Sequence, residues 1–206
     1  MNSVLLENIN NREFAVKEDT KITGINYKDD INLNIEIKKN CILELVLFTK
    51  EKNKNINLKL VLNDNSKFVF RNSFICNGTY NLNINTNIIG NNTLSDVKIR
   101  GINENNGNTK IIMNGINQKN TTNNTMNEYA KILNKSNNNS VIIPNLLINS
   151  YGIDANHGAS IGTISKKELF YVTSKGIDEK KAIKLIEYGF ILSIMDDEKE
   201  LIRPYL

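Results

Sequence analysis

Polar and apolar residues alternate along most of the first 160 residues of the chain. The clearest run is residues 31–37, in which Asn, Asn and Glu separate four apolar side chains. Similar runs occur at residues 56–60, 67–70, 82–84, 97–99 and 111–113, many of them roughly 12 to 15 residues apart. A period of two places successive side chains on opposite faces of an extended chain, so these runs predict short β-strands.

Clusters of Asn separate the predicted strands, for example at residues 63–66, 91–92 and 105–108. Short strands at this spacing are typical of a β-sandwich, a β-barrel or a coil of stacked strands. Asn favours the last, a β-helix, because it tolerates left-handed turns and its side-chain amides form ladders between stacked chains. We therefore predict a mainly β fold, with a β-helix of stacked short strands as the first choice and a sandwich as the alternative. The polar runs at residues 119–125 and 137–140 predict long loops between coils, the first of them mobile.

The last part of the chain has a different composition. Asn occurs 38 times, and the final one is Asn156. Because Asn is a weak helix former, its disappearance predicts a change from strands to helices. Residues 165–168, Ser-Lys-Lys-Glu, fit a capping box, and Gly176 is suited to ending that helix. Asp178 is predicted to cap a second helix over residues 179–195. We divide the chain into a β-helix core, residues 1–164, and a helical segment, residues 165–206.

Composition excludes several classes of protein. The chain is 40% hydrophobic and 23% charged, with a net charge of +4 and dispersed Lys residues, which argues against a dedicated nucleic-acid-binding protein. No apolar run approaches the ~20 residues of a membrane span, and the first residues do not resemble a signal peptide. The expected location is therefore the cytoplasm. Cys41 and Cys76 lack metal-ligand spacing and are expected to be reduced core residues.

His157 is the only histidine of the chain, and it lies in a run without repeats at residues 151–162. A neutral imidazole can ligate iron if an acceptor holds its second nitrogen. Asp154 is near in sequence, although strand alternation need not place it on the same face. One imidazole cannot hold an iron–sulfur cluster, so other ligands would have to come from a partner chain or from sulfide. A purely structural or surface role for His157 is the alternative.

The residues from His157 onward resemble the C-terminal signature of the SufB/SufD family, the scaffold proteins of the Suf iron–sulfur cluster assembly system. The runs His157-Gly-Ala-Ser-Ile-Gly162, Leu169-Phe-Tyr-Val172 and Ser174-Lys-Gly-Ile177 follow the order and spacing of the family. Gly158 after the histidine is similar to SufD, since SufB carries Glu there. The chain departs from the family in its length, about half the usual one. It also has Ala155 where many SufD proteins have Cys.

The resemblance implies a right-handed parallel β-helix and a non-catalytic, SufD-like scaffold. It implies pairing through the β-helix ends with a SufB-like partner or, in a homodimer, with a second copy. His157 would then lie where a transient iron–sulfur cluster forms, and no tightly bound cofactor is expected. The chain lacks a phosphate-binding loop, so a SufC-like ABC ATPase, bound by the helical segment, would hydrolyse ATP. The apolar residues we assign to this contact, with core packing as their alternative role, are Phe170, Tyr171, Ile177, Ile183, Ile186 and Phe190.

Two other functions compete with the scaffold hypothesis. A purely structural β-solenoid accounts for the Asn-rich strands, with the helices covering an end of the stack. A β-helix enzyme that acts on polysaccharides requires clustered carboxylates. The acidic residues predicted on strands, Glu36, Glu44 and Asp96, are instead scattered along the chain.

Overall fold

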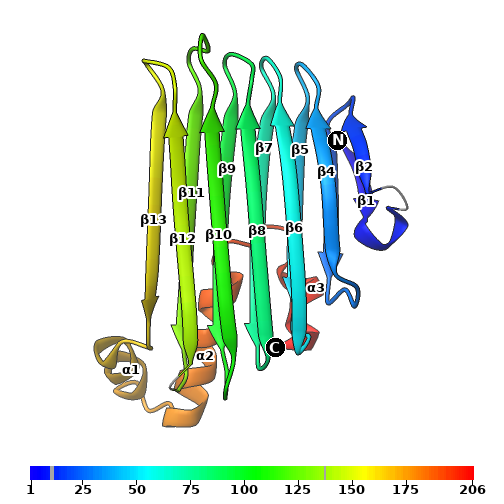
Figure 1. Cartoon of the computed structure of the whole chain (residues 1–206). Helices are drawn as coiled ribbons and strands as arrows, with labels where there is room; N and C mark the ends of the chain where they lie inside the picture. The colour runs from blue at the N-terminus through cyan, green and yellow to red at the C-terminus, as the bar shows by residue number, and fades with distance from the viewer. Residues whose placement is uncertain (10–11, 137) are drawn as a thin grey trace.

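The computed structural model describes residues 1–9, 12–136 and 138–206, and the strands among them alternate along the chain between two parallel sheets (Figure 1). The seven-stranded sheet contains, in spatial order, β1 (Asn2–Leu5), β3 (Thr20–Ile25), β5 (Ile42–Thr49), β7 (Lys67–Cys76), β9 (Leu94–Asn103), β11 (Thr125–Asn134) and β13 (Asp154–Gly162). The six-stranded sheet contains β2 (Glu13–Val16), β4 (Ile31–Ile37), β6 (Asn53–Leu62), β8 (Thr79–Ile88), β10 (Asn108–Asn117) and β12 (Asn139–Ile148). The predicted parallel β-helix is confirmed: the run at residues 31–37 is β4, and the other five predicted runs lie within longer strands.

The inward-facing side chains of the two sheets form one apolar core along the length of the stack. In β6, for example, Ile56, Leu58, Leu60 and Leu62 are all at most 1% exposed, whereas the Asn and Lys residues between them face solvent. Each strand is in register with the strands beside it in its sheet, so apolar side chains of successive coils lie in rows. A short 3-10 helix, η1 (Leu6–Asn8), follows β1.

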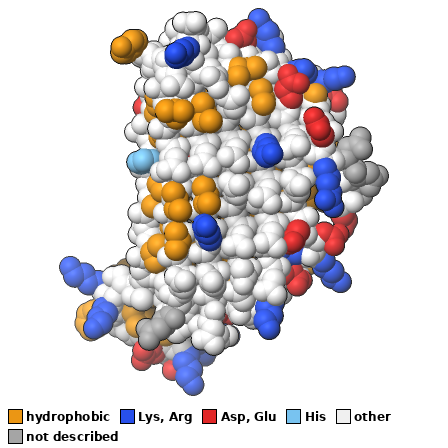
Figure 2. Space-filling view, in the orientation of Figure 1, with side chains coloured by type: hydrophobic (Ala, Val, Ile, Leu, Met, Phe, Trp, Pro, Cys, Tyr) orange, Lys and Arg blue, Asp and Glu red, His pale blue; other side chains and the backbone are white. Residues whose placement is uncertain are grey.

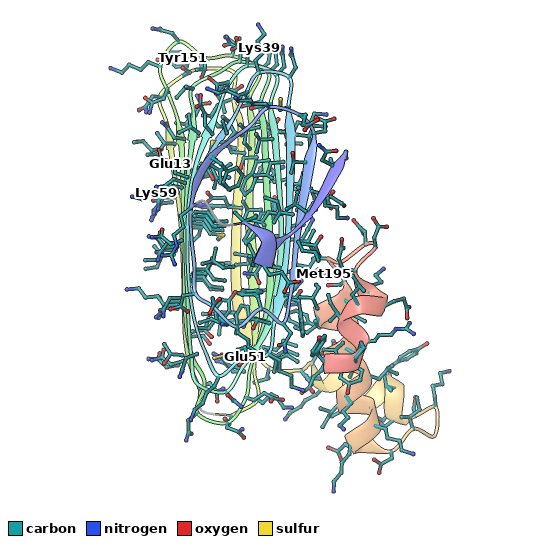
Figure 3. All side chains as sticks on the ribbon, turned by 90° about the vertical axis from the view of Figure 1, so that its right-hand side faces the viewer. Glu13, Lys39, Glu51, Lys59, Tyr151 and Met195 are labelled. Carbon is teal, nitrogen blue, oxygen red and sulfur yellow. The ribbon has the colours of Figure 1, made fainter. Side chains whose placement is uncertain are left out.

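The helical segment packs on the outer face of the seven-stranded sheet (Figure 3). It contains α1 (Lys166–Thr173), α2 (Glu179–Leu192), α3 (Lys199–Ile202) and a final 3-10 helix, η2 (Arg203–Tyr205). A second apolar cluster joins the two parts, with Val46, Phe48, Ile75, Ile102 and Leu133 from the sheet and Ile191, Ile194, Met195 and Ile202 from the helical segment. None of the helices in the described residues is long and apolar enough to cross a bilayer.

Asn residues form the predicted turn ladder. Asn40, Asn65, Asn92 and Asn123 occupy successive turns with positive φ angles between 54° and 61°. The Nδ2 of each later residue donates to the Oδ1 of the one before it, over 2.9, 3.1 and 3.2 Å. Asn is suited to this position because it tolerates the left-handed conformation and carries both a donor and an acceptor.

The loop predicted at residues 119–125 matches the connection between β10 and β11, whereas the one predicted at residues 137–140 is shorter than expected. β11 begins at Thr125 and β12 at Asn139, while Asn137 lies outside the described residues. The first run is not a loose loop, because Asn124 is buried and its Nδ2 donates to Gly90 O at 2.9 Å and to Asn117 Oδ1 at 2.8 Å. Thr121 and Asn124 are buried and hydrogen-bonded within the turn, whereas the rest of the loop is largely exposed.

The caps and bounds predicted for the two helices are confirmed only in part. Asp178 caps α2 as predicted, accepting from the backbone N–H groups of Lys180 and Lys181 at 3.0 and 3.3 Å. Ser165 is the N-cap residue of α1, but its side chain makes no capping hydrogen bond, so the predicted capping box is wrong. The second helix ends at Leu192 rather than at residue 195, and α3 was not predicted.

Substitution of Asn92 tests the turn ladder. Asn92→Ala should lower the free energy of unfolding by about 1–3 kcal/mol, because Ala is strained at positive φ and the ladder loses hydrogen bonds. Asn92→Gly keeps the left-handed conformation and should therefore cost less. Urea denaturation of the two variants measures the difference. An equal loss in both would show that the left-handed turn contributes nothing at this position.

Candidate functional site

His157 lies at the open end of the β-helix. Its strand, β13, is the last of the seven-stranded sheet, and β12 is the last of the six-stranded sheet. Within the described residues each of these strands pairs with one neighbour only, so one edge of each carries free backbone hydrogen-bonding groups. The exposed imidazole, the only one of the chain, lies at the left margin of the molecule in Figure 2.

The parallel register places His157 beside Glu128 of β11. Residues paired in this way on neighbouring strands lie about 5 Å apart and point to the same face. The flanking residues on β11, Met126 and Ala130, are buried in the interior, so Glu128 and His157 belong to the row that faces inward. No hydrogen bond or ion pair joins the two side chains in the part of the chain that the structure describes.

Glu128 is a buried carboxyl group in an apolar environment. Its side chain is 2% exposed, and its Oε2 has no hydrogen-bond partner among the described residues. Burial raises the pKa of Glu128 to about 7, because the charged form loses its hydration. Gly115 provides the space, since a Cβ added there would lie 2.9 Å from Glu128 Oε1. A buried acid without a partner is uncommon and is a typical mark of a functional site.

An imidazole nitrogen and a carboxylate oxygen are both suitable ligands for ferrous iron. Two ligands do not complete a metal site, and the described residues contain no group of three or more His, Cys, Asp or Glu that could hold an ion. Both cysteines are buried, burial raises the pKa of each thiol, and β9 and β11 separate the strand of Cys76 from that of His157. This chain therefore offers oxygen and nitrogen ligands at its open end, but no thiolate there.

Asp154 does not act as the acceptor for the imidazole. It lies three positions before His157 in the same strand, so the two side chains point to opposite faces. Its Oδ1 instead accepts from Asn156 Nδ2 at 2.9 Å. The carboxyl group near His157 belongs to a neighbouring strand, 29 residues earlier in the sequence.

The residues predicted to contact an ATPase differ in exposure. Phe170 and Tyr171 of α1 are 74% and 64% exposed, whereas Ile186 of α2 is buried. Ile177, Ile183 and Phe190 are partly buried. Phe170 and Tyr171 are therefore the predicted contact residues most available to a second protein, and Leu185 of α2, 54% exposed, adds to this apolar surface.

Glu128 was not identified from the sequence, because no strand was predicted between the polar runs at residues 119–125 and 137–140. Only its even spacing from Met126, Ala130 and Ile132 could have placed it on an inward-facing strand position. Its neighbour on β13 follows from the strand register, which the sequence pattern alone does not provide.

The raised pKa of Glu128 predicts how stability depends on pH. The folded chain holds the proton up to about pH 7, whereas an unfolded Glu releases it near pH 4.3, so unfolding becomes easier as pH rises between these values. The resulting penalty at pH 8 is on the order of 3 kcal/mol. Glu128→Gln, measured by urea denaturation from pH 4.5 to 8, should therefore gain stability relative to the wild type as pH rises. A constant difference across this range would contradict the assignment.

The chain is similar in sequence to one family of known proteins. The family described as "SUF system FeS cluster assembly, SufBD core domain" matches residues 32–190. The chain is similar to the iron–sulfur cluster assembly protein SufD of Bacillus subtilis, with 35% identity over 54 residues, which are 26% of this chain and 12% of the relative. It is also similar to an iron–sulfur cluster assembly SufBD family protein of Pyrococcus horikoshii, with 43% identity over 44 residues, 21% of this chain and 10% of the relative.

The aligned segments thus span only about a tenth of the length of these two relatives. The family match is broader, since it runs from β4 through β13 into α2 and covers most of the chain. The β-helix from β4 onward, its open end and the segment that carries His157 lie within the matched residues. The chain therefore belongs to the SufBD core domain family of the SUF iron–sulfur cluster assembly system.

Proposed function

We propose that the chain is a SufD-like scaffold subunit of a cytoplasmic iron–sulfur cluster assembly complex. It has no catalytic role of its own, and a SufC-like ABC ATPase supplies the energy. The observation that carries the proposal is the position of His157, exposed at the open end of the β-helix beside a buried, unpartnered carboxyl group.

The open end is the surface proposed to pair with a second β-helix. Free strand edges tend to recruit another strand unless they are covered. The inward-facing residues of β12, including Ile142, Leu146 and Ile148, are only partly buried, because no further coil follows them. A SufB-like partner, or a second copy of this chain, would cover both the edges and these side chains.

The cluster is proposed to form between the two partners. His157 would supply a nitrogen ligand to iron, and Glu128 an oxygen ligand once it is deprotonated. The thiolates that iron–sulfur clusters require would come from the partner, with sulfide as the bridging ligand. Iron and sulfide are the cargo of such a scaffold, so binding must be transient, and a site shared between subunits is suited to release.

The helical segment is proposed to bind the ATPase. Phe170 and Tyr171 present large aromatic surfaces on the outer side of α1, and exposed aromatic residues commonly dominate the affinity of protein interfaces. The segment is also well anchored, because α2 and α3 pack on the sheet through the second apolar cluster. A force applied to the helices would therefore reach the β-helix.

Anaerobic reconstitution with ferrous iron and sulfide tests the cluster site. The isolated chain should acquire little cluster, and its complex with a co-expressed SufB-like partner should acquire more. In that complex, His157→Ala and Glu128→Gln should each lower the bound iron and sulfide by about tenfold or more. Asp154→Asn, on the opposite face of β13, is the matched control and should have no effect. A stable cluster on the isolated chain, or full loading of the His157→Ala complex, would contradict the proposal.

Co-purification with a SufC-like ATPase tests the helical surface. The double substitution Phe170→Ala and Tyr171→Ala should weaken the complex by about tenfold or more, because hot-spot aromatics contribute about 2 kcal/mol or more each. Both side chains are exposed, so the fold should be retained, as circular dichroism can verify. Leu5→Ala, 52% exposed at the other end of the stack, is the control. Unchanged binding of the double variant would exclude this surface.

A further inference from the structure

A cleft lies between the outer face of the seven-stranded sheet and the helices α1 and α2. Its volume is about 460 Å³, a size typical of small-molecule sites. Leu133, Val172 and Ile186 contribute apolar walls. The cleft is separate from the open end, because its sheet residues point outward whereas Glu128 points inward.

Two cations face each other in this cleft. Arg100 of β9 and Lys131 of β11 are register partners, and both lie over the ring of Phe190, at 5.5 and 5.9 Å from its centroid. Like charges at directly paired positions repel each other. In the described residues neither cation forms an ion pair with a carboxylate. Most other Lys and Arg side chains on the strands of this sheet do form such a pair, namely Lys21, Arg71 and Lys98.

Arg100 is poorly satisfied by the protein. Its side chain is half-buried, and its only hydrogen bond among the described residues runs from Nη1 to the carbonyl of Ile99 at 3.4 Å. A guanidinium carries five N–H donors, so most of them lack a protein acceptor. Burial of a charged group without an acceptor is costly, and the cost is relieved when an anion occupies the site.

Other groups that line the cleft also favour an anion. The hydroxyl of Ser165 makes no capping bond to α1, and Thr163 adds a second hydroxyl. One acidic residue, Glu168, lines the cleft in the described part of the chain, and it is exposed and forms no ion pair with either cation. The net charge of the lining side chains is therefore positive.

We propose that this cleft binds a small phosphorylated molecule. Arg100 and Lys131 would hold the phosphate oxygens, with the two hydroxyls as additional donors. The apolar walls would contact the organic part of the ligand. Two adjacent cations with hydroxyl donors suit a doubly charged phosphate better than a single carboxylate. The inference needs neither iron nor a partner subunit, so it stands or fails separately from the proposed function.

Isothermal titration calorimetry of the isolated, iron-free chain tests the site, with inorganic phosphate, ADP and adenosine as probes at constant ionic strength. Phosphate and ADP should bind saturably at millimolar concentrations or below, and adenosine should bind at least about tenfold more weakly than ADP. Arg100→Gln with Lys131→Gln should weaken phosphate and ADP binding by about tenfold or more. Lys59→Gln with Lys110→Gln changes the net charge equally on the opposite sheet and should leave binding unchanged.

Three results would overturn the proposal: no heat of binding up to about 10 mM phosphate or ADP, equal affinity for adenosine and ADP, or unchanged binding in the cleft variant. If that double variant fails to fold, Lys131→Gln alone provides the test, because this side chain is exposed. It should weaken phosphate binding several-fold. Arg100→Lys keeps the charge but loses the planar donor geometry, and it should weaken binding less than the double variant does.

Discussion

The pairing register of β11 with β13 places the side chains of His157 and Glu128 on the same face of the sheet. A shift of this register by one residue would turn the His157 side chain to the opposite face, away from Glu128. Side chains in a strand alternate between faces, so register determines which groups meet. In this β-helix the register is repeated coil after coil, and the buried apolar rows of β6, β8 and β10 show the same repetition in the other sheet. The candidate metal site therefore depends on the whole stack, although its two candidate ligands lie on the last two strands of one sheet, β11 and β13.

The helical segment adds a second constraint on the same sheet. Beyond the apolar cluster, Lys21 of β3 forms an ion pair with Glu198 at 2.7 Å, and Lys135, just after β11, forms one with Glu187 of α2 at 2.9 Å. Both glutamates are buried, so these pairs are shielded from salt more than surface pairs are. Helices fixed in this way cover the outer face of the sheet and leave its open end uncovered.

Much of the fold could be predicted from the sequence because the alternation of Asn with apolar residues reports strand faces directly. It identified β4 and β6 to β10, and the tolerance of Asn for left-handed turns identified the turns that contain Asn65 and Asn92, although not the one at Asn40. The strand β5 was not predicted, because both of its faces are apolar. Val46 and Phe48 are buried under the helices while their neighbours fill the interior, so polar and apolar residues do not alternate there. The strand β11 was not predicted either, because the turns on both sides of it are polar, and their internal hydrogen bonds cannot be recognised from the sequence.

The sites were harder to predict than the fold. His157 could be identified because it is the only histidine of the chain. The roles proposed for Glu128, Arg100 and Lys131 depend instead on the residues paired with them on neighbouring strands. Helix-capping propensity also did not predict that the Ser165 side chain would make no capping hydrogen bond to α1. Local patterns therefore predict which residues face inward or outward. Which of them meet is settled by long-range pairing.

The strand β11 connects the two candidate sites through its alternation. Glu128 points inward to the row that ends at His157, whereas Lys131 points outward to Arg100 and Phe190. Two and four residues further on, Leu133 and Lys135 contact the helical segment through the apolar cluster and an ion pair, respectively. Because the peptide backbone of a paired strand is nearly inextensible, a displacement of β11 along its axis would move all these groups together. Substitutions on one face can nevertheless be interpreted independently, since the buried core and the outer cleft share no side chains.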